Sequence, residues 1–573
     1  MALHMKVARD SENSSPALNG GRAIAEGAEL VAAAKRIVHS HCAVYTHPDV
    51  ACSILDRVGW VASADLTQRR LLEPSCGDGS FLLPAVDRLL DSRRRAGEID
   101  EAGLSDRIVA FEFDISTAST LRRRLVEKLQ SAGLTTVVAK RIAARWLRCE
   151  DFLLAKGLAP FTDVVGNPPY MRWSKVPLTL RGLYEDNLPA HAARGDLCLA
   201  FICRAVELLA PATGRVAFLC SDRWLRCSYG SRARVEIEQT TRLTAHISVH
   251  DAPVFLGSRK VDAHAAVSLL ERGSSNSPVV VTKASSIADL RRKLLPPKNS
   301  ATQPSSVGLN GGQSAILAVR SLADAFQQIA STHAVLLDVG VEVRCGMALG
   351  CAPAFVVEET SEVEEERLVP FVRTSDLLDN GKVEPTSHVI NVWEADGTLV
   401  KLGKYPKLNA HLKPYRTDLA KRACVKTPAS WYRTIDRLDL PRVAAPKLLV
   451  AGMSKFARIA MSPGGAQPSN ALYAITSTEW PLEALFALFR AGALDLFATV
   501  LAPRFAGDVK RFDGNVLRQV RIPAWSGLNS SLQRRLLNWN VETNSRDANL
   551  VLDVYRLSDK RLRKAVELAI APG

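Results

Sequence analysis

Residues 71–81 read Leu71-Leu72-Glu73-Pro74-Ser75-Cys76-Gly77-Asp78-Gly79-Ser80-Phe81, and this stretch decides the fold of the first half of the chain. A short apolar run enters a glycine turn, and a helical pattern follows. In doubly wound α/β sheets, ligands bind at the carboxyl ends of strands, where glycines let the backbone come close. A plain strand-to-helix connection fits such a turn as well. The acidic Glu73 before the turn is unlike a loop that cradles phosphate.

Similar apolar runs recur on both sides of this turn and alternate with longer helical patterns, such as Leu197–Leu209. Strands that alternate with helices are typical of a parallel sheet. We therefore predict a doubly wound, Rossmann-like α/β domain over residues 23–295. Its expected strands are Arg70–Glu73, Ile108–Phe113, Asp163–Gly166, Arg215–Cys220 and Leu243–Val249.

Acidic residues end the second expected strand, Ile108-Val109-Ala110-Phe111-Glu112-Phe113-Asp114. A carboxylate at this place can accept hydrogen bonds from both ribose hydroxyls of a nucleoside cofactor. We prefer Glu112 to Asp114 for that role, although two acids also fit a plain helix start. Asp151 and Phe152, further along, can grip an adenine ring by a hydrogen bond and by stacking, but taken alone they indicate little.

Residues 163–170 read Asp163-Val164-Val165-Gly166-Asn167-Pro168-Pro169-Tyr170, a buried strand that breaks into Asn-Pro-Pro-aromatic. An exocyclic amino nitrogen is a poor nucleophile because its lone pair is delocalised into its ring. The Asn167 side-chain oxygen and the Pro168 carbonyl can accept its two N–H groups, and successive prolines fix the backbone. Tyr170 offers a face on which a base can stack. Unless it is only a rigid turn, this run predicts transfer to a planar nitrogen, driven by alignment and electrostatic preorganisation.

Two flanking pieces complete the set: Tyr45-Thr46-His47-Pro48 upstream, and Val254-Phe255 downstream. In this order the motifs resemble the γ-class N6-adenine DNA methyltransferases of bacterial restriction–modification systems. The resemblance covers most of the chain. It implies a site-specific enzyme that takes methyl from S-adenosyl-L-methionine, requires no metal, and methylates a flipped-out adenine in double-stranded DNA.

The resemblance also assigns roles to residues. Asn167, Pro168, Pro169 and Tyr170 form the catalytic run, and Tyr170 and Phe255 hold the target base. An ordinary core phenylalanine remains the alternative for Phe255, and the loop after it departs from the expected length, so Lys260 receives no role. The residues expected to bind the cofactor are Tyr45, Thr46, Glu73, Pro74, Gly77, Gly79, Glu112, Asp151 and Phe152.

Two other functions stay open at this point. The same chemistry would serve a methyltransferase that acts on a protein glutamine amide or on an RNA guanine amino group. Such enzymes usually carry only a small accessory domain. A nucleic-acid-binding protein with a decayed methylase core is the non-enzymatic alternative, and the intact Asn167 run, Gly77, Gly79 and Glu112 argue against it.

The rest of the chain divides into three segments that differ in composition and in their pattern of apolar residues. Residues 1–22 have the composition of a flexible tail, and residues 296–332 that of a linker followed by a helix from Ser314 to Ala330. Residues 333–573 are predicted to form a mixed α+β target-recognition, DNA-binding domain. Between Lys401 and Leu440 there are ten Lys and Arg with interleaved aromatics, and a second basic stretch contains Arg504, Lys510, Arg511, Arg518 and Arg521. Such stretches favour contact with phosphates, although a solvated basic face is the alternative.

The composition agrees with a nucleic-acid partner. The chain has 74 Lys+Arg against 59 Asp+Glu, a formal charge of +15, among its 573 residues. Its 11 cysteines are scattered without a C-x-x-C pair, as in reduced cytosolic proteins. Neither a secretion signal nor a membrane span is recognised. We expect a monomer in the bacterial cytoplasm, associated with the nucleoid. The few residues before Tyr45 leave no room for a nuclease domain, so a restriction endonuclease would be a separate chain.

Overall fold

A computed structural model describes residues 16–97, 99–257, 265–273, 280–295, 320–502, 504–505, 509–540 and 546–571. The chain forms two compact units, Met1–Ala315 and Ile316–Gly573. The division falls within the linker predicted over residues 296–332, of which 296–319 lie outside the described residues, as do the first six residues of the predicted helix and Lys260. Each unit is described by itself.

Unit 1 is built on an eight-stranded sheet in the order β3-β2-β1-β4-β5-β7-β6-β8. The five strands predicted from the sequence are all present and differ from the prediction only at their ends. The strands are β1 (Leu71–Glu73), β2 (Ile108–Phe111), β3 (Leu147–Arg148), β4 (Asp163–Gly166), β5 (Arg215–Ser221), β6 (Thr241–Ser248), β7 (Ala265–Arg272) and β8 (Val280–Lys283).

The prediction of a wholly parallel sheet is wrong at β7. Strands β3, β2, β1, β4 and β5 are parallel, whereas β7 runs antiparallel to both β5 and β6. The reason is local. No helix lies between β6 and β7 among the described residues, so the chain returns beside β6 in the opposite direction. The sheet is therefore mixed.

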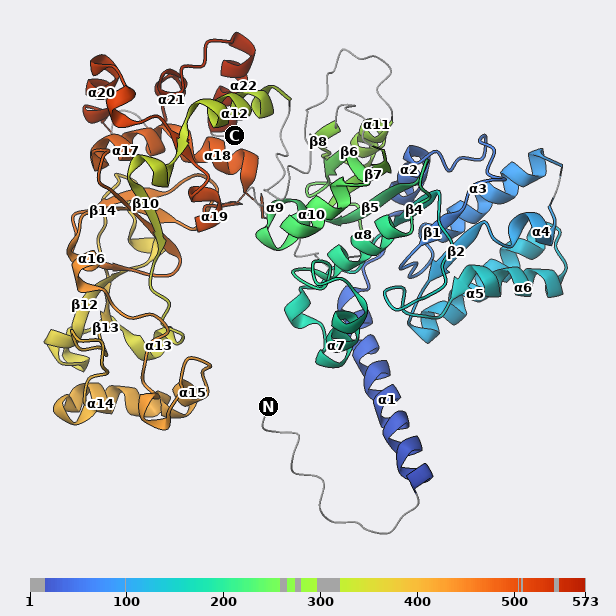
Figure 1. Ribbon diagram of the computed structural model, residues 1–573, viewed down its shortest axis with the longest axis horizontal. Helices are drawn as coiled ribbons and strands as arrows, with labels where there is room; N and C mark the ends of the chain where they lie inside the picture. The colour runs from blue at the N-terminus through green and yellow to red at the C-terminus, as the bar shows by residue number, and fades with distance from the viewer. Residues whose placement is uncertain are drawn as a thin grey trace. The chain divides into compact units, whose positions relative to one another are not determined.

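Helices cover both faces of this sheet. The main core lies between one face and the apolar sides of α2, α3, α5, α6 and α11, and α8 packs on β5. Figure 1 shows α3, α5 and α6 towards the β1–β2 end of the sheet and α11 beside β8. The helices are α1 (Pro16–Cys42), α2 (Pro48–Arg57), α3 (Leu82–Arg95), α4 (Glu101–Leu104), α5 (Ile115–Ser131), α6 (Thr136–Trp146), α7 (Leu178–Asn187), α8 (Leu197–Glu207), α9 (Arg223–Arg226), α10 (Ser231–Glu238) and α11 (Ile287–Leu294).

The first helix begins inside the segment predicted to be a tail. Helix α1 starts at Pro16, so residues 16–22 are helical, and residues 1–15 lie outside the described part of the chain. Its carboxyl end leads directly into Tyr45 and Thr46. The eleven cysteines are free thiols.

The described residues of unit 2 form four small sheets. Their strand orders are β10-β18-β14-β16, β11-β13-β12-β17, β15-β20-β19 and β21-β9. The strands are β9 (Ala334–Val335), β10 (Val341–Cys345), β11 (Val356–Val357), β12 (Leu368–Val372), β13 (Ser387–Ile390), β14 (Lys447–Ala451), β15 (Met453–Ser454), β16 (Ile459–Ser462), β17 (Gln467–Pro468), β18 (Leu472–Ser477), β19 (Arg504–Phe505), β20 (Val509–Arg511) and β21 (Arg521–Ile522).

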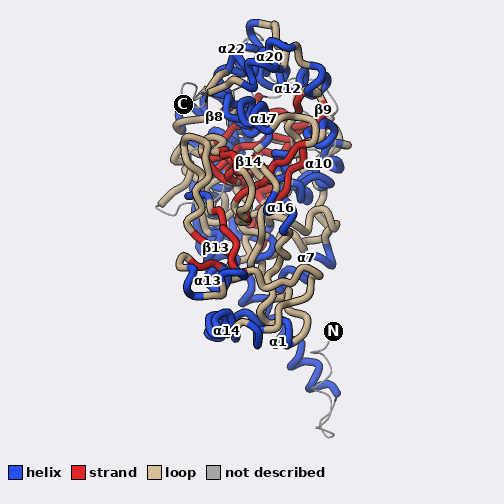
Figure 2. The backbone as a smooth tube through the Cα atoms, turned by 90° about the vertical axis from the view of Figure 1, so that its left-hand side faces the viewer, coloured by secondary structure: helices blue, strands red, loops and turns tan. Residues whose placement is uncertain are grey.

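Several helices of unit 2 lie at its two ends, and α16 lies between them (Figure 1). In Figure 1 and Figure 2, α13 and α14 lie with β13 at one end, and α17, α20 and α22 lie at the other. The first end has its own core around Phe355, Leu408 and Trp431. The helices are α12 (Arg320–Thr332), α13 (Ala352–Phe355), α14 (Pro406–Leu412), α15 (Arg416–Ala420), α16 (Leu440–Ala444), α17 (Leu482–Leu488), α18 (Leu494–Leu501), α19 (Gly514–Leu517), α20 (Ser530–Leu537), α21 (Ala548–Val554) and α22 (Lys560–Ile570).

One helical stretch, Leu482–Leu501, is long and apolar enough to cross a membrane, with a mean hydropathy of 1.8. However, 83% of it is buried inside the protein, as in a core helix. The stretch is also broken at Gly492, whose φ of 124° is one that L side chains rarely adopt. A Cβ atom at Gly492 would lie 2.2 Å from Cγ2 of Ile570 on α22. This kink therefore lets α17 and α18 pack closely against the last helix.

We predict that Gly492→Ala destabilises unit 2 by about 2–4 kcal/mol, because it adds steric overlap with Ile570 to an unfavourable φ. Gly465→Ala is the matched control, since Gly465 has a φ of 81° and no atom within 4 Å of the added Cβ. It should lower stability by about 1 kcal/mol. Scanning calorimetry of the full chain measures both changes. An equal loss in the two variants would contradict the packing argument.

Candidate active site

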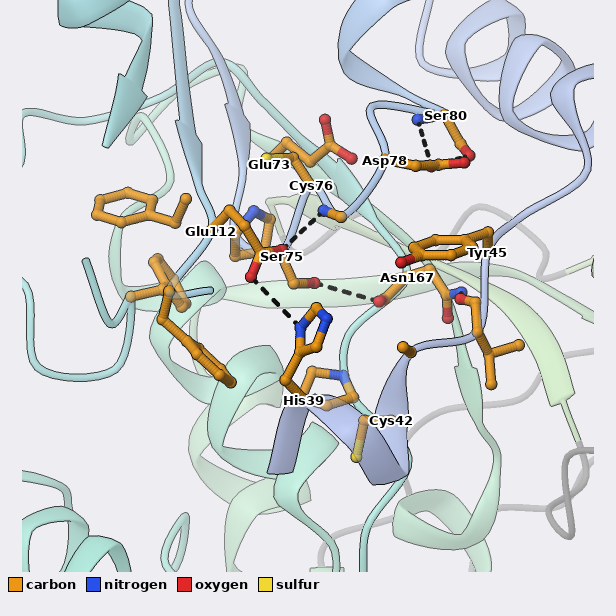
Figure 3. A pocket seen from close by; sticks show the side chains of 18 of the residues that line it. His39, Cys42, Tyr45, Glu73, Ser75, Cys76, Asp78, Ser80, Glu112 and Asn167 are labelled. Atoms are coloured by element: carbon orange, nitrogen blue, oxygen red, sulfur yellow. Dashed lines mark hydrogen bonds and ion pairs between the residues drawn. The ribbon is translucent and has the colours of Figure 1, made fainter. Parts of the chain in front are cut away.

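A pocket opens in unit 1 at the carboxyl ends of β1, β2 and β4, with an empty volume of about 710 Å³ that includes its open mouth. Figure 3 shows Tyr45 and Glu112 at opposite sides, with Ser75 and Asn167 between them. Most of the lining comes from the end of α1 and from the turns after these strands. The lining residues are 38–39, 42–46, 73–78, 80–81, 111–113, 150, 152, 167, 169 and 201.

Strand register brings the motifs together. In the parallel pairing, Leu71 of β1 lies opposite both Ile108 of β2 and Asp163 of β4. All three strands therefore end at the same edge of the sheet. Glu73, Glu112 and Asn167 stand at or directly after those ends and meet at the pocket, although they are far apart in the sequence.

The glycine turn after β1 is shaped by close packing. Gly79 has a φ of 88°, and a Cβ atom there would lie 2.6 Å from Cδ1 of Leu121 on α5. Only glycine fits this position without a shift of its neighbours. The Gly77 N–H donates to Glu112 at 3.0 Å, so the turn is tied to the end of β2.

Glu73 is a buried acid with a free oxygen. Its side chain is 1% exposed, and Oε2 has no hydrogen-bond partner. Burial raises the pKa of Glu73 well above its usual value, and repulsion from Asp78 and Glu112 raises it further. A buried, unpaired carboxylate is unfavourable unless a cation or donor reaches it. The pocket therefore fits a ligand that brings positive charge to Glu73.

Glu112 is held by the main chain. Oε1 accepts the Asp114 N–H at 2.8 Å, and His39 of α1 lies with Nδ1 3.7 Å from the same oxygen (Figure 3). Burial raises the pKa of Glu112, against the opposing effects of these neighbours. Each carboxylate oxygen has two acceptor positions, so Glu112 keeps capacity for donors from a ligand, such as ribose hydroxyls. The sequence did not single out His39, because it lies in an ordinary helical pattern.

Asn167 has a fixed amide orientation. The side-chain Nδ2 of Asn167 donates to the Val44 carbonyl at 3.0 Å. The main-chain carbonyl of Asn167 accepts from the Ser75 hydroxyl at 3.1 Å. Because a carbonyl only accepts, the amide nitrogen must face Val44 and the amide oxygen must face away. That Oδ1 atom is buried and has no partner. The geometry thus leaves one strong acceptor free on a residue that lines the pocket.

Tyr170 and Phe255 lie next to this pocket but do not line it. Their ring centroids are 5.9 Å apart with an interplanar angle of 87°, and the Tyr170 hydroxyl donates to the Leu219 carbonyl. Phe255 forms a β-bridge with Thr46, and the Leu256 N–H donates to the Tyr45 carbonyl at 2.9 Å. The segment around Tyr45 is therefore bonded directly to the segment that carries Phe255.

Aromatic rings form another wall. Phe152 packs against Phe111 at 5.5 Å and against Phe201 of α8 at 5.4 Å between centroids. Asp151 is not among the lining residues. Its carboxylate accepts from the Tyr184 hydroxyl at 2.8 Å and from the Leu153 N–H at 3.1 Å. Burial raises the pKa of Asp151, although the bond from Tyr184 lowers it.

The structure brings most of the predicted site residues to one place. Those that line the pocket are Tyr45, Thr46, Glu73, Pro74, Gly77, Glu112, Phe152, Asn167 and Pro169, whereas Gly79, Asp151, Pro168, Tyr170 and Phe255 surround it. His39 and Phe201 also line the pocket, and no sequence motif pointed to them. Within the described ranges, no three His, Cys, Asp or Glu side chains gather as metal ligands.

Comparisons with known proteins identify relatives of this chain. Residues 116–255, which include the Asn167 run and Phe255, match the Eco57I restriction-modification methylase family. Among solved structures, the type IIL restriction-modification enzyme MmeI has a similar fold. The TM-score is 0.55 at 13% identity, and the match covers 94% of this chain and 75% of that chain.

Sequence relatives extend over nearly the whole chain. The type II methyltransferase M.PaeR7I of Pseudomonas aeruginosa is 32% identical over 532 residues, which is 90% of this chain and 92% of the relative. M.XhoI of Xanthomonas vasicola is 31% identical and covers 88% of this chain and 95% of its own. This chain therefore belongs to the type II methyltransferases of restriction–modification systems.

Proposed function

We propose that this methyltransferase transfers the methyl group of S-adenosyl-L-methionine to the N6 atom of a flipped-out adenine in double-stranded DNA, and that it protects the host in a restriction–modification system. The observation that carries the proposal is the free, buried Oδ1 of Asn167 beside the pocket. The solved structure of MmeI in complex with DNA supports DNA as the partner.

The residues of the pocket fit the cofactor. S-adenosyl-L-methionine supplies an electrophilic methyl group on a sulfonium, and it carries a second cation, the amino group of its methionine part. The unpaired Glu73 oxygen offers that amino group a buried partner. Glu112 offers acceptors for ribose hydroxyls, and Phe152 and Phe201 offer apolar faces for adenine.

The chemistry on the substrate side follows from Asn167. Its Oδ1 accepts an N–H of the target amine, and the Pro168 carbonyl accepts the other. Together they draw the nitrogen lone pair out of conjugation, so that it points at the methyl group. A strong base is not needed, because the amine can lose its proton after attack. Acceptors that are fixed in advance lower the barrier without reorganisation at the moment of reaction. Val44 and Ser75 provide this fixation by holding Asn167 on two sides.

The N6 atom of a paired adenine is out of reach inside a duplex, so the base must leave the stack. Tyr170 and Phe255 supply aromatic surface for it beside Asn167. A glutamine amide or a guanine amino group would meet the same acceptors. The large second unit favours DNA over these substrates. We further propose a monomer in the bacterial cytoplasm, associated with the nucleoid, and a separately encoded endonuclease that cuts the same site.

The substrate is tested directly by transfer of labelled methyl from S-adenosyl-L-methionine to duplex DNA, RNA or protein extract. Digestion of each product to nucleosides or amino acids should place the label in N6-methyladenosine of DNA. Label in glutamine or guanosine, with none in adenine, would overturn the proposed substrate.

Asn167→Ala should lower kcat by at least about a hundredfold, because it removes the acceptor that activates the amine. Binding of S-adenosyl-L-methionine, measured by calorimetry, should remain largely intact. Asn538→Ala, an exposed position after α20, is the control. Turnover in Asn167→Ala equal to that of the control would mean that the reaction centre lies elsewhere.

We predict that the affinity for S-adenosyl-L-methionine depends on pH through the ionisation of Glu73. Since the pKa of Glu73 is raised in the folded protein, the group loses its proton when a cation binds. Affinity should therefore rise with pH up to that raised pKa, and calorimetry in buffers of different ionisation enthalpy should detect proton release. Glu73→Gln should abolish the release and weaken binding roughly 10- to 100-fold.

The same substitution should stabilise the protein without cofactor. A carboxyl whose pKa is raised by folding makes its stabilising contribution at low pH, and the contribution is lost as pH rises from the unfolded value through the folded one. Glu73→Gln removes that loss, so its melting temperature at neutral pH should exceed that of the wild type. Glu127→Gln, an exposed residue of α5, should change neither property. Proton release that persists in Glu73→Gln would assign it to another group.

A further inference from the structure

The basic stretch of residues 401–440 offers less to DNA than its sequence predicts, because several of its cations are used inside unit 2. The Arg422 guanidinium donates to the carbonyls of Leu349, Trp431 and Arg433. The Arg437 guanidinium donates to the Ala395 carbonyl. The interleaved Trp431 and Tyr432 are buried in the core. These groups hold the fold together and are not available to read DNA.

The second basic stretch behaves in the same way. Lys510 is buried and lies 3.6 Å from Asp495, and Arg521 donates to the His333 carbonyl. Arg518 donates to the Val343 carbonyl at 3.4 Å, and Arg511 pairs with Asp513 at 3.0 Å. The side chain of Arg504 lies outside the described residues. The arginines and aromatics named above are therefore engaged within unit 2, whereas the exposed cations that remain in the first stretch are mostly lysines: Lys401, Lys404, Lys407, Lys413, Lys421 and Lys426.

A cleft in unit 2 is lined by side chains that can donate hydrogen bonds to DNA. Three segments within residues 347–356, 371–375 and 469–471 line it, and its empty volume is about 1330 Å³ including its open side. It is nearly twice as large as the cofactor pocket by the same measure. Apolar side chains such as Met347 and Phe371 line part of it, and hydroxyl, amide and guanidinium groups line the rest.

Ser469 carries an unsatisfied hydroxyl on this cleft. The residue is only 8% exposed, and its Oγ has no hydrogen-bond partner. Its backbone is fixed by a bond from its N–H to the Val372 carbonyl at 2.9 Å and by a β-bridge to Met347. Buried hydroxyls are normally hydrogen-bonded, so an unpaired one that lines a cleft indicates a ligand that completes it.

Arg373 is the one charged residue among those that line the cleft. Its guanidinium pairs with Glu358 at 3.3 Å, with side chains that are 40% and 74% exposed. Exposed ion pairs of this kind contribute little free energy, so Arg373 can exchange Glu358 for a better acceptor. The lining thus carries a positive charge and no carboxylate, which suits an acceptor-rich, anionic ligand.

We propose that this cleft receives one strand of the DNA duplex, where Arg373 and Ser469 donate hydrogen bonds to acceptor oxygens or nitrogens of the DNA. The inference rests on the proposed function, since an enzyme that acts on one flipped-out base must read the neighbouring bases by other contacts. The acceptors belong either to a base edge, such as guanine O6 and N7, or to a phosphate. Base edges and phosphates both accept hydrogen bonds from Arg373 and Ser469. Only contacts with base edges make binding depend on the DNA sequence.

The test uses the full chain and a defined DNA. Sequencing of methylated DNA from cells that express the protein identifies the site. A duplex with that site, its single-base-pair variants and an unrelated duplex are then the probes. Binding by fluorescence anisotropy and methyl transfer are compared in wild type, Arg373→Ala and Ser469→Ala. Arg561→Ala is the matched control, because Arg561 is also an exposed arginine paired with an acid, on α22 at the other end of unit 2 (Figure 1).

Arg373→Ala should weaken binding to the site duplex roughly ten- to a hundredfold. A loss confined to one base pair assigns Arg373 to a base edge. A uniform loss, with a salt dependence reduced by about one ion, assigns it to a phosphate. Ser469→Ala should lower affinity or discrimination several-fold while its melting temperature stays that of the wild type, because Oγ has no partner within the protein.

Wild-type behaviour of both variants on every duplex, with active wild-type enzyme, would overturn the cleft as a DNA site and leave the proposed function standing. If the wild type transferred no methyl to any DNA, the proposed function itself would fail. An equally large fall in affinity in Arg561→Ala and Arg373→Ala would show that the loss of any positive charge weakens DNA binding. That result would also contradict the proposal that the cleft binds DNA.

Discussion

The parallel pairing of β1 with β4 is the interaction on which the active site depends. It sets the ends of both strands at the same edge of the sheet, so Glu73 and Asn167 lie on one pocket although they are far apart in the sequence. Strand β2, on the other side of β1, adds Glu112. Backbone hydrogen bonds between short buried strands thus place the three groups, and the surrounding helices keep those strands from solvent.

The charge of the pocket contrasts with that of the chain. The protein as a whole is strongly basic, with a formal charge of +15, yet Glu73, Asp78 and Glu112 all line the cofactor pocket. Burial raises the pKa values of both Glu73 and Glu112, and repulsion from Asp78 and Glu112 raises that of Glu73 further. Such a site favours a ligand that carries positive charge, whereas the net charge of the whole chain favours a polyanion. The two preferences match the two substrates proposed for the enzyme.

The sequence predicted the parts that depend on local pattern. The sequence predicts the glycine turn and the strands before Glu73, Glu112 and Asn167. Each of these elements is a short continuous stretch in which an apolar run leads directly into the motif residues. The antiparallel β7 was not predicted, because its direction depends on a connection without a helix. His39 and Phe201 reach the pocket through contacts between segments distant in the sequence, which leave no trace in a single sequence. Composition also does not show whether an arginine of the basic stretches, such as Arg422, faces outwards or donates to neighbouring carbonyls.

The group that orients Asn167 belongs to the main chain. The Val44 carbonyl selects which way the amide faces, and every amino acid at position 44 would present the same carbonyl. The orientation is therefore insensitive to substitution at position 44, provided that the backbone keeps its path between α1 and Tyr45. A mutational scan would record this position as tolerant, even though one of its atoms fixes the central side chain of the site. Functional importance and mutational sensitivity are separate quantities wherever the backbone supplies the contact.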